Sequence, residues 1–132
     1  MDKYGILAKQ AATTSLADLY VCPETEEKTY DSTNISVRPL AATRRASTLI
    51  SSIVVCRLAA TGGAAEWISL AVVDAAGGAV GNSNYILYQM DIAGGVTKVI
   101  GLSMTLSAGQ ALRVISEANG SINVIVNGVE IV

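Results

Sequence analysis

Short runs of apolar residues, separated by turn-forming residues, dominate this chain. Runs of roughly five to nine residues rich in Val, Ile, Leu and Tyr recur between clusters of Gly, Asn and Ser, as β-strands do. No window keeps apolar residues at helical spacing between helix caps. The pattern predicts strands at residues 4–8, 16–22, 48–58, 67–73, 85–90, 97–102, 104–106, 112–116, 122–127 and 129–132.

The spacing and phase of these runs predict how the strands are arranged. Residues 48–58 carry apolar side chains on both parities, which is typical of a strand covered on both faces, so we predict a central strand there. Asn119-Gly120 is a strong hairpin signal, and Asn127-Gly128 predicts a further turn. Together the runs make about eight strands at short, regular spacing. This number and spacing predict an all-β, single-domain antiparallel β-sandwich that is jelly-roll-like.

One long stretch lacks this pattern. Cys22-Pro23 ends a run, an acidic cluster follows, and polar and small residues continue past Pro39. We therefore predict a long irregular loop or arm at about 24–46, with at most a short strand around 35–37, inside a single domain of residues 1–132. Loops of this length in a compact domain are usually functional or disordered.

Charge is scarce and unevenly distributed. Charged residues make up 15% of the chain, against about 25% in a typical protein. The net charge of −2 gives no electrostatic basis for binding nucleic acid or a membrane surface. Residues 32–65 contain no acid and four arginines, Arg38, Arg44, Arg45 and Arg57. This basic segment is either a solvated loop or an arginine-led contact with an acidic protein partner.

The residue types that carry most catalysis are missing or scattered. The chain contains no His, which excludes Ser/His/Asp and Cys/His nucleophile systems and His metal ligands. The glycine clusters lack the spacing of nucleotide-binding loops. A glycosidase needs two converging carboxylates, but the acids occur singly and are interpreted as solvated: Asp18, Asp74, Asp91, Glu66, Glu117 and Glu130. We expect no enzyme activity, no catalytic residues, no metal and no cofactor.

Two cysteines and three aromatic residues leave alternatives open. Cys22 and Cys56 each end an apolar run, which favours free buried thiols over a disulfide. Trp67, with Tyr85 and Tyr88, is interpreted as packing at a core edge or subunit interface; the alternative is a sugar-stacking platform.

Composition also bears on location and self-association. The first residues show no signal-peptide pattern, and no apolar run approaches the roughly 18 residues of a membrane span, so we expect a soluble cytoplasmic product. A weakly charged surface with many small residues does little to oppose association. It suits a symmetric homo-oligomer docked on a larger assembly.

Four runs, in order, resemble a family of small β proteins encoded among the structural genes of tailed bacteriophages. They are Ser-Ser-Ile-Val-Val-Cys at 51–56, Asn-Tyr-Ile-Leu-Tyr at 84–88, Gly-Leu-Ser-Met-Thr-Leu-Ser-Ala-Gly at 101–109 and Asn-Gly-Val-Glu-Ile at 127–131. Residues 16–23 fit the strand and turn that open the family pattern. Simpler members pass from that turn almost directly to the Ser-Ser-Ile-Val-Val strand, whereas this chain inserts roughly residues 24–45.

The resemblance implies a bacteriophage virion protein and, within that class, points to a capsid decoration (cement) protein. Such a protein would form a homotrimer, bind the major capsid protein on the outer shell, and be assembled in the host cytoplasm without contacting nucleic acid or membrane. We assign the protein interface to Arg38, Arg44, Arg45, Trp67 and Tyr85. The alternatives are a tail, neck or fibre component, or a carbohydrate-binding β-sandwich module.

Overall fold

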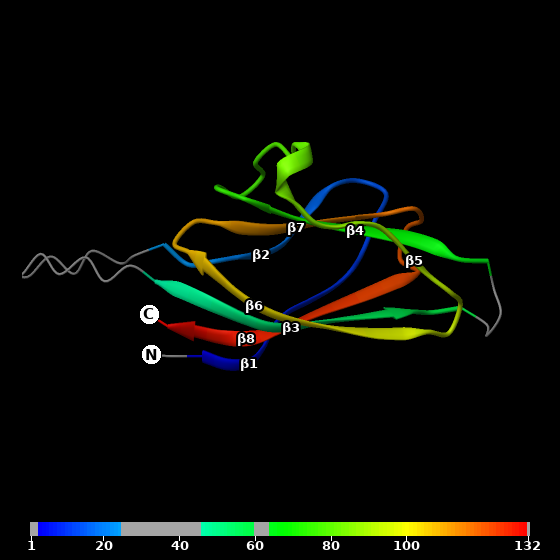
Figure 1. The fold of residues 1–132 in the computed structure, drawn as a ribbon, viewed down its shortest axis with the longest axis horizontal. Helices are drawn as coiled ribbons and strands as arrows, with labels where there is room; N and C mark the ends of the chain where they lie inside the picture. Colours follow the sequence, from blue (N-terminus) through cyan, green and yellow to red (C-terminus); the bar gives the residue numbers. More distant parts are fainter. Residues whose placement is uncertain (1–2, 25–45, 60–63, 132) are drawn as a thin grey trace, which may run out of the picture.

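The computed structural model describes residues 3–24, 46–59 and 64–131, which form two stacked antiparallel sheets of four strands each (Figure 1). One sheet has the order β1-β8-β3-β6 and the other β2-β7-β4-β5. The predicted all-β antiparallel sandwich is confirmed. The strands are β1 (Lys3–Ala11), β2 (Ala17–Val21), β3 (Ser47–Arg57), β4 (Glu66–Val73), β5 (Tyr85–Ile92), β6 (Thr97–Ser107), β7 (Ala111–Ser116) and β8 (Ile122–Ile131), and a 3-10 turn, η1 (Asn82–Asn84), precedes β5.

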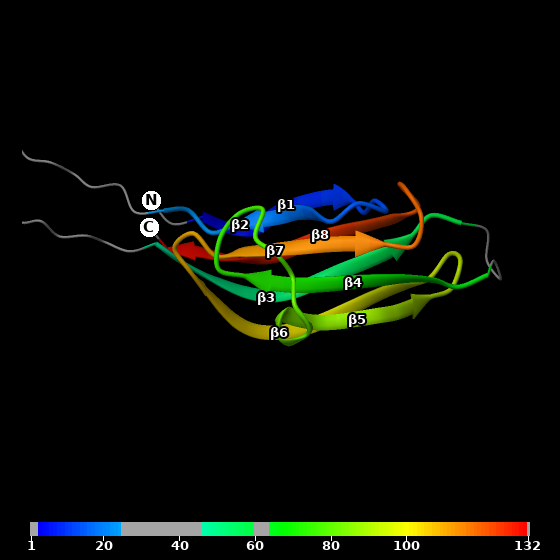
Figure 2. The same cartoon turned by 90° about the horizontal axis from the view of Figure 1, so that it is seen from above.

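The strands pair in the nested order of a jelly roll. β1 pairs with β8, β2 with β7, β3 with β6 and β4 with β5. A long antiparallel hairpin of eight strands rolled into two sheets produces this order. The ends of β1 and β8 lie side by side, with Lys3 opposite Glu130, so both termini leave the same end of the sandwich (Figure 2).

The jelly-roll order corrects the prediction made from Asn119-Gly120. Gly120 does adopt a left-handed φ of 73°, as a turn glycine does. However, the turn joins β7 in one sheet to β8 in the other, so it is not a hairpin. Consecutive strands change sheets at every connection except β4–β5, which a local turn signal does not reveal.

A bulge explains the double parity of β3. The register shifts between Ile50 and Ser52, so Thr48 and Ile50 face the core before the bulge and Ile53, Val55 and Arg57 face it afterwards. The prediction of a strand covered on both faces is therefore wrong, because one apolar face changed phase. The prediction that this strand is central is confirmed, since β3 pairs with both β6 and β8.

Two predicted breaks do not occur. Residues 97–102 and 104–106 belong to one strand, β6, and residues 122–127 and 129–131 belong to β8. Gly128 lies inside β8. The residue at this position must be glycine, because a Cβ atom there would collide with the carbonyl oxygen of Leu49 on β3. The glycine permits a close approach of two strands and does not form a turn.

Small and branched aliphatic side chains fill the space between the sheets, as the composition predicts. The largest fully buried side chains are Ile50, Ile53, Ile68, Leu70, Ile92, Leu106, Leu112, Ile122, Val55, Val114, Val124 and Val126. They come from both sheets and alternate with outward residues along β3, β7 and β8. This core fixes which side chains point outward, and the outward faces carry the candidate sites.

Candidate interaction surfaces

The outer surface of sheet β1-β8-β3-β6, called here the open face, is nearly free of charge. Directly opposed residues share a face, so the register assembles four rows of four outward positions across these strands. Lys9 is the only charged residue among them. The rows are Tyr4–Val129–Leu49–Thr105, Ile6–Asn127–Ser52–Gly101, Lys9–Ile125–Val54–Val99 and Ala11–Asn123–Cys56–Thr97.

Large apolar side chains are concentrated on this sheet. Of eight exposed large apolar side chains in the described residues, five point outward from it: Tyr4, Ile6, Leu49, Val99 and Ile131. Polar side chains in the middle bond to one another, since the Asn127 amide donates to the Ser52 hydroxyl at 3.2 Å. No described segment lies over this face, which is the lower surface in Figure 1. Contiguous apolar surface of this kind marks interaction sites.

The opposite outer surface, on sheet β2-β7-β4-β5, is partly covered. The connection between β4 and β5, including η1, folds over it (Figure 1). Arg113 of β7 forms an ion pair with Asp18 of β2 at 2.9 Å and donates to the Gly78 carbonyl at 2.7 Å. Asp18 in turn accepts the Gly77 N–H through both carboxylate oxygens, at 3.0 and 3.1 Å. This pair fastens the connection to the sheet and leaves the two outer faces chemically different.

A second ion pair joins strands at the end of the sandwich away from the termini. Arg57 of β3 lies 3.1 Å from Glu66 of β4, and its side chain is only 7% exposed. Arg57 also donates to the carbonyls of Ala64 and Ile92, while Glu66 accepts from the Ser121 hydroxyl. The cluster therefore links β3, β4, β5 and the start of β8.

A polar cluster lies between the sheets near the termini. The Tyr20 hydroxyl donates to Glu130 at 2.7 Å and accepts from the Thr48 hydroxyl at 2.8 Å, and the Thr48 oxygen lies 3.2 Å from the Cys22 sulfur. Burial is the largest cause that raises the pKa of Tyr20 above its ordinary value. The Glu130 carboxylate raises that pKa further, whereas the hydrogen bond with Thr48 lowers it.

These contacts correct the interpretation as solvated for three of the six acids, whereas Asp74, Asp91 and Glu117 are exposed. Asp18 and Glu66 form ion pairs, and Glu130 accepts a hydrogen bond from a buried tyrosine. Glu117 accepts the backbone N–H of Trp67 at 3.1 Å. In each case the carboxylate joins strands to one another or to a connection and has a structural partner.

The predicted interface residues divide into three groups. Arg38, Arg44 and Arg45, like the predicted short strand 35–37, lie outside the described residues. Tyr85 is half-buried at the start of β5, and its ring meets that of Tyr88 edge to face at 4.9 Å. Trp67, also half-buried, stands opposite Asp91, whereas Tyr85 stands opposite Ala71.

The structure therefore does not place Trp67 beside Tyr85. The four-residue offset along β4 corresponds to about 13 Å at the usual rise of a strand. The structure brings the two tyrosines together without the tryptophan. A platform that uses Trp67 and both tyrosines as one stacking surface is not formed.

The cysteines are free, as predicted, but only one is fully buried. Cys22 lies between the sheets and Cys56 is half-buried on the open face. The two thiols point to opposite sides of sheet β1-β8-β3-β6. The predicted burial is confirmed for Cys22 and wrong for Cys56, because the bulge in β3 turns position 56 outward.

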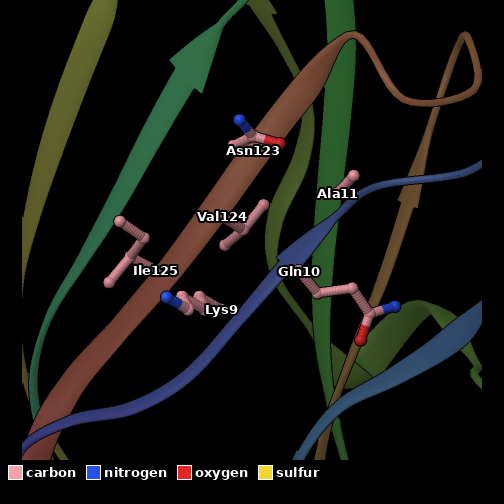
Figure 3. A pocket seen from close by; sticks show the side chains of 6 residues that line it. All are labelled: Lys9, Gln10, Ala11, Asn123, Val124 and Ile125. Carbon is pink, nitrogen blue, oxygen red and sulfur yellow. The ribbon is translucent and has the colours of Figure 1, made fainter.

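A shallow hollow of about 280 Å³ lies between β1 and β8 (Figure 3). Its lining consists of Lys9, Gln10, Ala11, Asn123, Val124 and Ile125. Lys9, Ala11, Asn123 and Ile125 are outward positions of the rows, while Gln10 points away from Lys9 in Figure 3. The hollow is thus a depression in the open face at its edge.

The described ranges contain no group of three His, Cys, Asp or Glu side chains arranged to hold a metal ion. They also contain no helix long and apolar enough to cross a membrane.

No family model matches this chain, and no curated protein matches it. Among solved structures, the fold is similar to a chain of the T13 particle of infectious bursal disease virus, with 5% identity and a TM-score of 0.46. A chain of the Gx strain of that virus gives 7% identity and a TM-score of 0.44. Each likeness covers 98% of this chain, which spans 30% of the length of those viral chains. A structure of maize chlorotic mottle virus gives 15% identity and a TM-score of 0.28, with 98% of this chain and 90% of that chain covered.

Proposed function

We propose that this chain is a structural component of a virus particle and, more narrowly, a capsid decoration (cement) protein of a tailed bacteriophage. In this proposal it self-associates, binds the outer surface of the shell through the major capsid protein, and performs no reaction. Three observations support it: the four runs that resemble phage structural proteins, the eight-stranded jelly-roll order, and the open face. Jelly rolls of this kind occur in viral capsid proteins and also in lectins.

The open face is the observation that carries the proposal. Sixteen outward positions in a four-stranded sheet include a single charge, Lys9, and two interior strands expose Leu49 and Ile131. Such a surface suits a broad, lasting contact with protein, because it gains free energy from buried area and needs no ionic partner.

The open face suits contact between copies of the chain, and stabilisation of a shell comes from a separate contact with the shell. A protein that binds the assembled shell, and not its separated subunits, shifts the equilibrium toward the assembled state by mass action. We assign Trp67 and Tyr85 to contacts between copies of the chain. Arg38, Arg44 and Arg45 are assigned to contacts with neighbouring capsid or decoration subunits.

The direct test is reconstitution on shells. Purified chain is mixed with phage heads that lack it, and the heads are sedimented and then heated. We expect the chain to sediment with the heads and to raise the temperature at which they open. A chain that stays in the supernatant and leaves that temperature unchanged would overturn the proposal.

The same samples distinguish the alternatives. Binding to isolated tails, with none to heads, would identify a tail, neck or fibre component. A glycan-binding screen of wild type and Trp67→Ala addresses the carbohydrate-binding module. Glycan binding that is lost in Trp67→Ala would favour that module over a decoration protein.

A further inference from the structure

We propose that the open face is occupied by a second copy of this chain, packed face to face across a twofold axis. The inference deepens the proposed function, since self-association is part of it, but it names a surface and a symmetry that the function does not supply. It follows from the charge, the area and the geometry of the face.

The charge of the open face permits contact with its own image. In a twofold interface the same patch occurs on both partners, so a patch with several like charges would repel itself. Only Lys9 is charged among the four rows, and it lies on the edge strand β1, where its amine can reach solvent at the rim. The face of the opposite sheet offers less free surface, because the β4–β5 connection and the Arg113–Asp18 pair occupy part of it.

The area of the open face meets the requirement of a stable dimer. Its strands contain 9, 10, 11 and 11 residues. Four strands about 4.8 Å apart and about ten residues long at about 3.3 Å per residue cover roughly 600 Å² of plane, before the relief of the side chains is added. Two copies would together bury more than the roughly 1,000 Å² expected of a specific interface.

The geometry of the open face allows a second sheet to pack against it. Outward positions alternate with core positions on either side of the register shifts in β1 and β3, and the exposed Tyr4, Ile6, Leu49 and Val99 lie in three neighbouring rows. Two such surfaces can interdigitate at about 10 Å, as the two sheets of the sandwich do. The central polar pair, Asn127 and Ser52, bond to each other, and their remaining donors and acceptors can pair with the same residues of the second copy.

The twofold symmetry determines how many chains an assembly can contain. A twofold contact at the open face makes every complete assembly contain an even number of chains. Alone it gives a dimer of about 27 kDa, twice the 13.6 kDa chain. Combined with the threefold contact that the family resemblance implies, it gives six chains in D3 symmetry.

The test is the mass of the purified chain in solution, measured by sedimentation equilibrium at micromolar concentration. We expect two or six chains in wild type, and half that number in a variant carrying Tyr4→Lys and Leu49→Lys. These positions are 71% and 41% exposed within one chain, so lysine fits the fold while placing charges in the interface. The expected rise in the dissociation constant is at least about 100-fold.

Val21→Lys is the matched control. Val21 is 37% exposed, close to the 41% of Leu49, but it lies on β2 in the other sheet. We expect this variant to keep the wild-type mass. If the double variant fails to fold, Val99→Lys replaces it, because Val99 is 69% exposed on the edge strand β6.

Two results would overturn the inference. One is a wild-type assembly with an odd number of chains, a monomer included. The other is an even-numbered assembly whose mass the open-face variants leave unchanged. Neither result depends on shells, so failure here is distinguishable from failure of the decoration function.

Discussion

Gly128 shows how a single residue decides whether two strands can pair. It stands opposite Ile50 in β3 and Gly5 in β1, with the Leu49 carbonyl oxygen in the space that a Cβ atom would occupy. A side chain there must push β8 away from β3, the pair of strands at the centre of the sheet. The sequence pattern Asn-Gly suggests a turn at this place, and only the neighbouring strand explains the glycine.

We predict that Gly128→Ala destabilises the fold by about 2–3 kcal/mol, since overpacking against backbone cannot relax through a side-chain rotation. Urea unfolding followed by circular dichroism measures the change. Gly101→Ala on β6 is the control, because a Cβ atom at Gly101 meets nothing within 4 Å. Equal stability losses in the two variants would contradict the account of Gly128.

Tyr20 should make the stability of the fold depend on pH above about pH 10. Its pKa in the folded protein is raised above the value of about 10 in the unfolded chain, chiefly by burial. Above pH 10 the unfolded chain loses the proton first, so the stability that is fully present below pH 10 is lost as pH rises. The loss approaches about 1.4 kcal/mol per pH unit for this one group once the unfolded chain is fully ionised.

Tyr20→Phe separates this effect from the titration of other groups. We expect wild type to lose stability more steeply than Tyr20→Phe between pH 10 and 11, in denaturant titrations at matched ionic strength. Parallel slopes for the two proteins would show that Tyr20 titrates alike in both states.

At the residue scale, the sequence predicts the apolar core but not the partners of the acids. Asp18 meets Arg113 and Tyr20 meets Glu130, which are 95 and 110 positions apart in the chain. A local pattern of polar residues cannot specify such pairs, since they exist only once the strand order is known. These acids therefore look solvated until the sheets are assembled.

At the scale of elements, the alternation of apolar and polar residues locates all eight strands within a few residues of their observed ends. Two of the errors have a physical cause in the strand pairing. A bulge shifts the phase of β3 at Ile50, which makes one buried face look like two. Glycine permits close strand approach as well as turns, so Gly128 is ambiguous in the sequence.

The two ion pairs differ in how tightly they join elements. Arg57 is 7% exposed and Glu66 22%, whereas Arg113 is 12% and Asp18 31% exposed. Removing one charge of a buried pair leaves the other without compensation. The Arg57 cluster also spans four strands, so its loss affects more of the fold.

We predict that Glu66→Gln costs about 3 kcal/mol of stability. Asp18→Asn should cost about 1 kcal/mol, because its pair is more exposed to solvent. Thermal unfolding of both variants beside wild type measures the difference. A larger stability cost for Asp18→Asn than for Glu66→Gln would contradict the view that the Arg57–Glu66 pair joins its elements more tightly.

At the scale of the whole molecule, the open face is a product of topology. Tyr4, Val129 and Leu49 form one row although they come from the start, the end and the middle of the chain. The composition predicts a weakly charged β framework suited to packing against copies of itself. The free face can be identified only once the strand order and the register are known. The same holds for the face that the β4–β5 connection partly covers.

The predicted interface residues that the structure describes do not form one surface. Trp67 and Tyr85 lie on the same pair of strands but four positions apart in register, while the open face contains neither. The sequence points to Trp67 and Tyr85 because amphipathic rings suit a sheet face at a core edge or interface. Leu49 and Val54 look like core residues until the bulge and the pairing place them outside.

Cryo-electron microscopy of intact phage particles that contain this chain tests the central claim most directly. The account predicts density for an eight-stranded, two-sheet sandwich at symmetric positions on the outer surface of the head. Density for the chain in the tail or neck, with none on the shell, would contradict it.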